Sequence, residues 1–161
     1  MPFLTTGGHT VRTVGRGAGS DVRWDPSRGQ IAAAGLDGVD AVIHLAGSSV
    51  AERWTAATKA EILSSRVQGT RLISETLARM AMKPEVLVCA SGIGIYGSRG
   101  EEWLDETSSH GADFLAEVGE AWEAATAPAR AAGVRVALGR AGVVQNAAGG
   151  ARRHRTDLSR F

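Results

Sequence analysis

The chain has 161 residues, of which 43% are apolar and 22% charged, and its formal net charge is +1 at pH 7. This composition is typical of one globular domain, and the charge gives no basis for nucleic acid or a membrane surface as the main partner. No apolar run approaches the ~20 residues of a membrane span. The lone cysteine, Cys89, excludes an internal disulfide, and its apolar neighbours indicate a buried thiol. We therefore expect a cytoplasmic protein.

The first part of the chain predicts short elements separated by glycine-rich turns. Strand patterns cover 10–14, 21–26 and 39–47, and a short helix fits within 31–38. The third of these strands reads VDAVIHLAG, a nearly continuous apolar run that is typical of a strand covered on both faces. We interpret His44 within it as a core histidine with its hydrogen bonds satisfied.

The second part predicts longer elements. The helical spacing of apolar residues covers 55–80 and 112–133, and apolar strand patterns cover 86–91 and 134–140. Thr55 and Asp113 are the predicted N-caps, and Gly133 ends the second helix. Alternation of strands and long helices predicts an α/β fold, with a parallel sheet, right-handed crossovers and helices on both faces.

Ligands of such sheets bind outside the carboxyl ends of the strands. Glycine recurs at each predicted end, which permits close approach of a ligand. These ends are Gly15-Arg16, Leu45-Ala46-Gly47, Ala90-Ser91-Gly92 and Arg140-Ala141-Gly142.

Gly92, Gly94 and Gly97 spell G-x-G-x-x-G behind an apolar strand. A dinucleotide fingerprint would open a helix whose N-terminus faces the pyrophosphate, but the residues at 98–111 are polar and aperiodic and predict a loop. We interpret the motif as a strand end at the reactive side of a cofactor site, and not as the phosphate-binding turn. No metal site is expected, because no histidines or carboxylates have ligand spacing.

Five stretches, in this order, resemble the extended short-chain dehydrogenase/reductases, and within them the NAD-dependent epimerase/dehydratase family whose epimerase-like proteins carry a C-terminal DUF1731 region. The stretches are VDAVIHLAGSSV, RWTAATKAEILSSRVQGTRLI, VLVCASGIGIYG, DFLAEVGEAWEAA and GVRVALGRAGVV. That family begins with a strand and a G-x-T-G-x-x-G turn, whereas MPFLTTGGHTVRTV resembles the end of the following helix and the second strand.

The resemblance implies a partial Rossmann-type doubly wound parallel sheet that lacks its first strand and its glycine-rich phosphate turn. The absent strand would lie between those at 10–14 and 39–47. Residues 1–150 would form an incomplete NAD(P)-binding domain, and the basic tail at 151–161 would lie outside the fold. Both ends indicate a gene model that is truncated or misread.

The cofactor is expected to be NADP rather than NAD. Arg16, after Gly15 at the end of the second family strand, suits a 2′-phosphate where NAD-binding relatives offer a carboxylate, the alternative being a solvated loop arginine. The resemblance also places Leu45, Ala46 and Gly47 against the adenosine side of the cofactor.

Glu61 and Arg66 lie on the first long helix and are further cofactor candidates. SRVQGT resembles the N-V-x-G-T segment of the family with Arg66 in place of asparagine, so Arg66 could reach a phosphate or ribose while Glu61 orients it. A surface ion pair is the alternative. The resemblance adds Val144, which ends the last matching stretch.

Catalysis in most of the superfamily requires a Ser or Thr after the strand at 86–91 and a Tyr-x-x-x-Lys on the next helix, whose lysine lowers the pKa of the tyrosine. Here Phe114 and Val118 stand at the tyrosine and lysine positions, and neither carries a proton. Ser91 and Tyr96 remain as catalytic candidates, with a packing role as the alternative for Tyr96.

Two functions follow from this comparison. One is an NAD(P)-dependent epimerase/dehydratase-like oxidoreductase that acts on a small molecule and is impaired in cofactor binding. The other is a non-catalytic NADP-binding sensor or scaffold. A fragment that has no function and binds nothing is the remaining alternative. The two long helices often form a dimer interface in this superfamily, so the resemblance allows a homodimer without requiring one.

Overall fold

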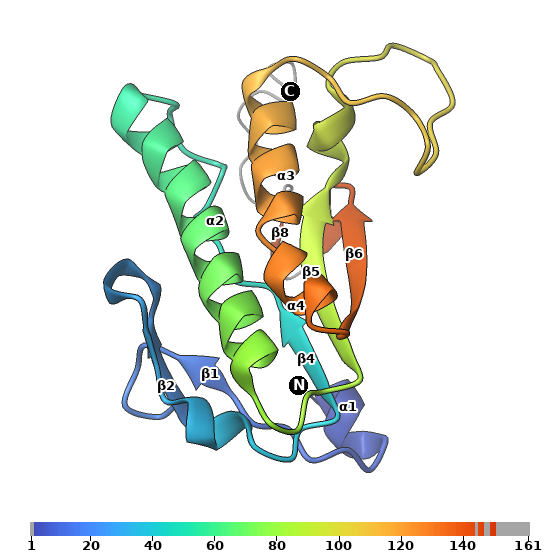
Figure 1. The fold of residues 1–161 in the computed structure, drawn as a ribbon. Coiled ribbons are helices and arrows are strands. Elements are labelled where there is room, and N and C mark those ends of the chain that lie inside the picture. Colours follow the sequence, from blue (N-terminus) through green and yellow to red (C-terminus); the bar gives the residue numbers. More distant parts are fainter. Residues whose placement is uncertain (1, 144, 147–148, 151–161) are drawn as a thin grey trace.

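The computed structural model describes residues 2–143, 145–146 and 149–150 (Figure 1). The helices are α1 (Pro2–Thr6), α2 (Ala56–Arg79), α3 (Phe114–Ala124) and α4 (Ala127–Ala131), with 3-10 turns η1 (Pro26–Arg28), η2 (Ala33–Leu36) and η3 (Ile93–Tyr96). The strands are β1 (Val14–Gly15), β2 (Val22–Asp25), β3 (Gln30–Ile31), β4 (Ala41–His44), β5 (Val86–Gly92), β6 (Arg135–Ala141), β7 (Gln145–Asn146) and β8 (Gly149–Gly150).

Helix α2 has nearly the predicted bounds because its N-terminus is capped as expected. The Thr55 hydroxyl accepts a hydrogen bond from the backbone N–H of Thr58 at 3.1 Å. At the other end, Met80 has extended backbone geometry and Pro84 follows shortly after. The Thr55 cap satisfies one of the backbone N–H groups that a helix start leaves without an intrahelical partner.

The helix predicted at 112–133 is divided into α3 and α4. Asp113 caps α3 by accepting from the N–H of Ala116 at 2.9 Å, as predicted. Pro128 lies in the first turn of α4, where its missing N–H costs nothing, but it would break a continuous helix. Gly133 ends α4 with a φ of +90°, a conformation that favours glycine.

The sheet consists of two main parts in the described residues. One has the order β1-β2-β3, with β1 parallel to β2, and the other has the order β4-β5-β6, with all strands parallel. Each of β1 and β4 pairs with a single strand, and no ladder joins them within the described chain. The sheet is therefore divided at the place where the absent strand was expected.

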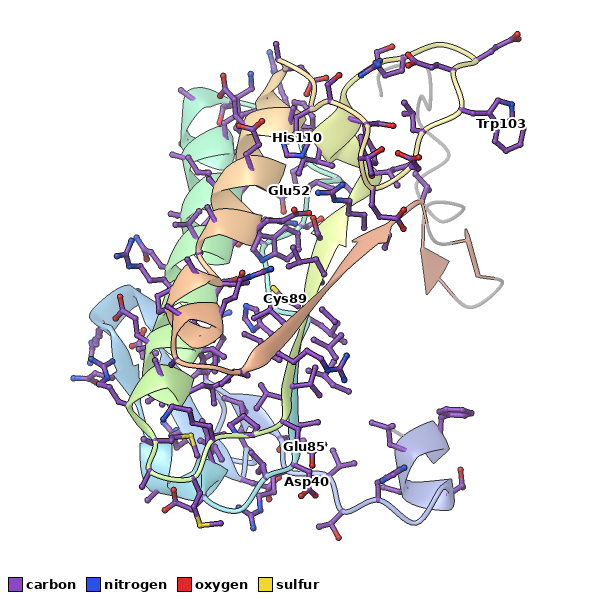
Figure 2. All side chains as sticks on the ribbon, turned by 45° about the vertical axis from the view of Figure 1, so that its right-hand side comes forward. Asp40, Glu52, Glu85, Cys89, Trp103 and His110 are labelled. Carbon is purple, nitrogen blue, oxygen red and sulfur yellow. The ribbon has the colours of Figure 1, made fainter. Side chains whose placement is uncertain are left out.

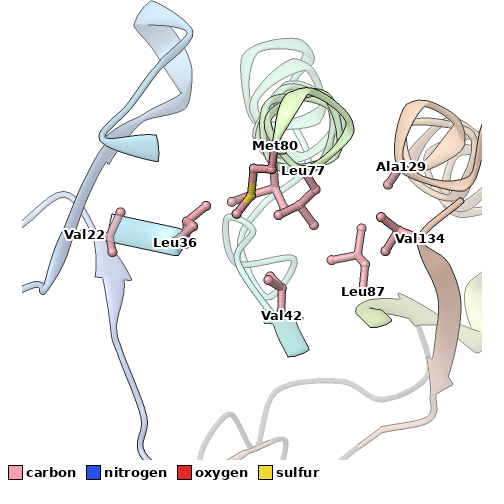
Figure 3. Close-up of a cluster of buried hydrophobic side chains, with 9 residues drawn as sticks. Val22, Leu36, Val42, Leu77, Met80, Leu87, Ala129 and Val134 are labelled. Atoms are coloured by element: carbon pink, nitrogen blue, oxygen red, sulfur yellow. The ribbon is translucent and has the colours of Figure 1, made fainter. Parts of the chain in front are cut away.

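One hydrophobic core joins the two parts. Its buried members are Val22, Leu36, Val42, Ile73, Leu77, Met80, Leu87, Ala129 and Val134. Figure 3 shows Leu77 and Met80 of the α2 end between Val22 and Leu36 on one side and Leu87 and Val134 on the other. Helix α2 thus packs against both groups of strands.

The β4-β5-β6 sheet has one buried face and one open face. Leu87, Cys89 and Ser91 alternate along β5 and are buried on the side that α2 and α3 cover. On the opposite face, Ile43 of β4 is 50% exposed. Among the described residues, the long helices lie on one side of this sheet, and α1 lies apart from them (Figure 2).

The unpaired edges predict an uneven and modest stability. Strand β5, bonded on both sides, should show the slowest amide hydrogen exchange, while β1 and β4 exchange much faster, measured by mass spectrometry or NMR. We expect a cooperative melt below about 55 °C, in the lower part of the range of mesophilic domains. Equal protection in β4 and β5, or a melt well above that temperature, would contradict this view of the edges.

Candidate functional site

The carboxyl ends of the parallel strands form one edge of the molecule, and most predicted site residues lie there. Loop 45–55 follows β4, and η3 with loop 97–113 follows β5. Figure 2 shows Trp103 at the outer tip of the second loop, and this side chain is 98% exposed. The loops are anchored back to the helices by the contacts described next.

Arg66 of α2 reaches the end of β4. Its guanidinium donates to the carbonyl oxygens of Ser48 and Ile62 at 3.0 and 3.1 Å and lies over the Trp122 ring, 5.0 Å from its centroid. A Cβ on Gly47 would lie 3.2 Å from Arg66 Cζ, so the glycine makes room for this arginine. Burial lowers the pKa of Arg66. No ion pair with Arg66 occurs among the described residues.

Glu61 is engaged elsewhere. Its carboxylate accepts a hydrogen bond from the Ser48 hydroxyl at 2.9 Å, and the Ser48 backbone N–H donates to Ser65. The structure therefore joins Glu61 and Arg66 to the same loop residue, and does not bring their charged groups together as an ion pair. The expected orienting contact between them is replaced by two separate anchors on loop 45–55.

The other predicted cofactor residues are exposed or half-buried, or lie outside the described part. Arg16 follows β1 and is exposed, Leu45 is 73% exposed, and Ala46 is half-buried. A Cβ on Gly15 would lie against the Ser20 hydroxyl, which would have to rotate away. Val144 lies outside the described residues.

Ser91 and Tyr96 belong to one buried polar network. The Ser91 hydroxyl donates to the Glu123 carboxylate at 2.6 Å, and the Arg140 guanidinium donates to both oxygens of Glu123 at 2.9 Å. Arg140 also donates to the Tyr96 hydroxyl oxygen at 2.8 Å and lies over its ring. Strand β5, the turn η3, α3 and β6 each contribute one side chain.

The charges of this network stabilise one another. Burial raises the pKa of Glu123, but the hydrogen bonds from Arg140 and Ser91 outweigh it and hold this pKa below its ordinary value. The hydrogen bond with Glu123, and to a smaller extent the one with Tyr96, raises the pKa of Arg140. The side chains are only 17% and 12% exposed, so this is a bidentate ion pair with little screening by water.

Sequence reasoning missed Glu123 and Arg140. One signal lies on α3, where the small buried residues Ala116 and Gly119 are followed by Glu123 at helical spacing. A carboxylate on a buried helix face requires a partner. Arg140 pairs in register with Ser91 on the neighbouring strand, but only the sheet registration shows this.

The glycines of the G-x-G-x-x-G stretch serve local packing. A Cβ on Gly94 would lie 3.1 Å from the Cβ of Leu115. The backbones of Gly97 and Gly111 are in close contact, because a Cβ on either residue would collide with the Cα of the other. Gly97 has a φ of +67°, and the N–H of Gly111 bonds the carbonyl of Ile95 at 2.9 Å. These glycines let loop 97–113 close on η3, and no α-helix begins at them.

The positions of the family tyrosine and lysine are apolar contacts here. Phe114 packs edge-on against Trp54, and Val118 is buried. Lys59 is half-buried, with its ammonium 4.9 Å from the centroid of the Phe114 ring. Proton transfer at these two positions is therefore excluded by their chemistry.

Two buried titratable side chains lie beneath the site. Burial raises the pKa of Cys89 to about 11, which keeps the thiol protonated and unreactive, as its apolar strand predicted. His44 is buried, as expected, but its Nε2 has no hydrogen-bond partner in the described part of the chain, so the expectation that its hydrogen bonds are satisfied is wrong. Its ring packs edge-on against Trp24, and burial lowers its pKa to about 4.

Within the described ranges, no helix is long and apolar enough to cross a membrane. The same part of the chain has no group of three or more histidine, cysteine or acidic side chains placed to hold a metal ion.

Parallel strands joined by crossover helices define a Rossmann-type fold, in which ligands bind outside the carboxyl ends of the strands. Residues 5–142 match the NAD dependent epimerase/dehydratase family, and the chain belongs to that family. It is 37% identical over 151 residues to epimerase family protein Mb2239 of Mycobacterium bovis, which covers 91% of this chain and 50% of that protein. Epimerase family protein SDR39U1 of Bos taurus is 34% identical, over 94% of this chain and 52% of that protein. The chain thus spans about half the length of these relatives.

Solved structures agree with this assignment. Human epimerase family protein SDR39U1, solved with NADPH, superposes with a TM-score of 0.80 at 28% identity, over 95% of this chain and 52% of that one. A nucleoside-diphosphate sugar epimerase from Corynebacterium glutamicum has a TM-score of 0.77 at 42% identity, over 90% of this chain and 31% of that one.

His44 predicts a pH-dependent stability. Its pKa is about 4 in the folded chain and 6.5 in the unfolded one, so the unfolded state binds the extra proton. The free energy of unfolding should fall by about 3 kcal/mol as the pH drops from 6.5 to 4. Urea titrations of the wild type and of His44→Phe, which keeps the ring against Trp24, measure this loss. The exposed His9→Phe is the control, and an unchanged pH slope in His44→Phe would reject the assignment.

The Glu123–Arg140 pair predicts a strong effect of breaking it on one side. Glu123→Ala leaves the Arg140 charge without its carboxylate and should lower the free energy of unfolding by about 3 kcal/mol. The double variant Glu123→Leu with Arg140→Leu should lose less than the sum of the two single variants. Urea denaturation tests this, with Glu120→Ala on the exposed side of α3 as a control expected within about 1 kcal/mol of wild type. Additive losses would show that the two side chains are not coupled.

Proposed function

We propose that the chain is the cofactor-binding part of an NADP(H)-dependent epimerase/dehydratase-like oxidoreductase that acts on a small molecule. The observation that carries the proposal is Arg66, a half-buried cation at the carboxyl end of β4 to which no described residue offers a carboxylate. A cation in that position, beside Gly47, fits an anionic ligand at the edge where nucleotides bind in this fold.

Arg16 supports the choice of NADP over NAD. Its side chain is exposed after β1, and no hydrogen bond or ion pair to it is formed by a described residue. A guanidinium with its donors available fits a 2′-phosphate, whereas a ribose diol would be matched by a carboxylate. The human relative that was solved with NADPH agrees with this preference.

The residues present fit part of the dinucleotide. Arg16 and Gly15 would hold the 2′-phosphate end, Arg66 and Glu61 would hold a phosphate or ribose, and Leu45–Gly47 would contact the adenosine side. A bound nicotinamide would supply hydride transfer, which interconverts an alcohol and a carbonyl group. Ser91, near the end of β5, and Tyr96, in η3, are the groups that would bind the substrate oxygen.

A non-catalytic NADP-binding sensor or scaffold is the second candidate. Phe114 and Val118 favour it, because both positions that carry the proton chemistry in most of the superfamily are occupied by packed apolar side chains. The Ser91–Glu123–Arg140–Tyr96 network favours the enzyme, because a buried ion pair that holds two hydroxyls is more than a scaffold requires.

Three further assignments belong to this proposal. Residues 1–150 belong to the incomplete cofactor domain, and the basic tail expected at 151–161 lies outside the described residues. The protein works in the cytoplasm, which the lone buried thiol of Cys89 supports. A homodimer through the long helices is compatible with the proposal and not needed by it.

We expect weak and phosphate-selective binding of the cofactor. NADPH should bind this chain with a dissociation constant weaker than ~1 mM, because no helix N-terminus preceded by a glycine-rich turn holds the pyrophosphate in the described residues. It should still bind about two- to fivefold more tightly than NADH, because a charged contact to the exposed Arg16 is screened by water. Titration followed by NMR measures both constants.

Arg16→Gln should abolish the preference for NADPH, and Arg66→Gln should weaken NADPH and NADH alike. Arg130→Gln, an exposed change on α4, is the matched control. A micromolar dissociation constant would contradict the expected weakness. Equal affinity for NADH and NADPH in the wild type would refute the NADP assignment.

A further inference from the structure

The open face of the β4-β5-β6 sheet is apolar across all three strands. It is the face opposite to Leu87, Cys89 and Ser91, and the strand register brings small or aliphatic side chains together on it: Ala41, Ile43, Val86, Val88, Ala90 and Ala137. Within the described strands its one charged side chain is Arg135, at the amino end of β6. Parallel sheets are normally covered on both faces, so this surface has the composition of an interior without the cover.

Helix α1 presents a second apolar surface. Its sequence, PFLTT, contains no charged residue, and Phe3 is 87% exposed. In Figure 2, α1 lies on the side of the sheet away from α2 and α3, which is the side of the open face. The chain is anchored to the core from Arg12 onward, because this guanidinium donates to the carbonyl oxygens of Gly35 and Asp37 at 3.0 and 2.9 Å. Residues 7–11 link the helix to that anchor.

We propose that a second copy of this chain covers the open face, and that the two copies exchange α1, so that Phe3 of each packs on Ile43 and Val88 of the other. The same two surfaces then meet twice about a two-fold axis, which closes the assembly at a dimer. This interface differs from the one between the long helices that the resemblance allows. It lies away from the site network, and it does not rest on the proposed function.

The charge of the two surfaces favours a copy of the chain over a charged partner. Neither α1 nor the centre of the open face carries a charge, and the net charge of the chain is only +1, so two copies approach with little repulsion. A nucleic acid or a strongly charged protein would meet a single complementary or repelling group, Arg135, at the edge of the patch.

The area agrees with a weak dimer. Phe3 and the side chains of the open face offer roughly 500 Å² of accessible apolar surface in each copy, a patch that is large for a monomer. A pair of copies would bury about 1,000 Å² in total, the lower limit of a specific interface. We expect a dissociation constant on the order of 10 μM.

Sedimentation of the chain without cofactor tests the proposal. From about 1 to about 200 μM, the wild type should pass from monomer to dimer. Phe3→Ser, at an exposed position that folding does not require, should weaken the dimer by about tenfold or more, because one large apolar side chain is no longer buried. Ile43→Thr, which keeps a β-branched side chain in the strand, should act in the same direction. Met82→Ser removes another exposed apolar side chain and is the matched control.

Mixing the two variants tests the exchange. In a mixed dimer, the Ile43→Thr copy supplies an intact Phe3 to the intact face of the Phe3→Ser copy, so one of the two contacts is restored. An equimolar mixture should therefore dimerise more strongly than either variant alone. If α1 instead folded onto the face of its own chain, mixing would restore nothing.

Four results would overturn the proposal. They are a monomer throughout the concentration range, a dimer that Phe3→Ser leaves intact, a mixture no stronger than its components, and oligomers that grow beyond the dimer. Leu63→Ser, on the exposed side of α2, separates the two interfaces. A dimer that is lost in Leu63→Ser and kept in Phe3→Ser would belong to the long helices.

Discussion

Helix α2 is the element on which the arrangement of this chain depends. No strand ladder joins β1 to β4 in the described residues, so the two groups of strands are held together by side chains packed on α2. Leu77 and Met80 contact apolar residues of both groups (Figure 3). Because burial of one large apolar side chain contributes about 1.5–3 kcal/mol, a few such contacts replace part of what a continuous sheet would supply.

The same helix determines where the polar residues of the site lie. Thr70 of α2 accepts a hydrogen bond from the Trp122 indole at 2.9 Å, and Ser74 bonds both the carbonyl of Thr126 and the N–H of Ala129. These buried contacts fix α3 and α4 against α2. Since Glu123 follows Trp122 directly, they also fix the carboxylate that holds Ser91.

The site differs from the pattern of its superfamily in a coherent way. The expected tyrosine and lysine positions, Phe114 and Val118, belong to packed apolar contacts, while the polar groups are gathered on β5, η3, α3 and β6. Arg140 places its guanidinium against the Tyr96 hydroxyl oxygen. The polar side chains of this edge thus lie on other elements than those of the superfamily motif.

Most elements could be predicted from the sequence because their signals are local. Apolar periodicity and the side-chain caps Thr55 and Asp113 place the long helices, and continuous apolar runs place β4, β5 and β6. The division of the last helix at Pro128 also has a local cause, although the apolar pattern across it conceals the break. A cap acts within one helical turn, so the residues that form it are close together in the sequence.

The contacts of the site had to wait for the tertiary structure. Ser91 and Glu123 are 32 positions apart, and Tyr96 and Arg140 are 44 positions apart, so no spacing rule connects them. Glu61 and Arg66, five positions apart on one helix, were expected to interact, yet loop 45–55 offers each a separate partner. The sequence by itself determined which residues form strands, helices and caps. The packing of α2 and α3 on the sheet decided which charges meet, because a buried charge takes its partner from whatever the fold brings within hydrogen-bond distance.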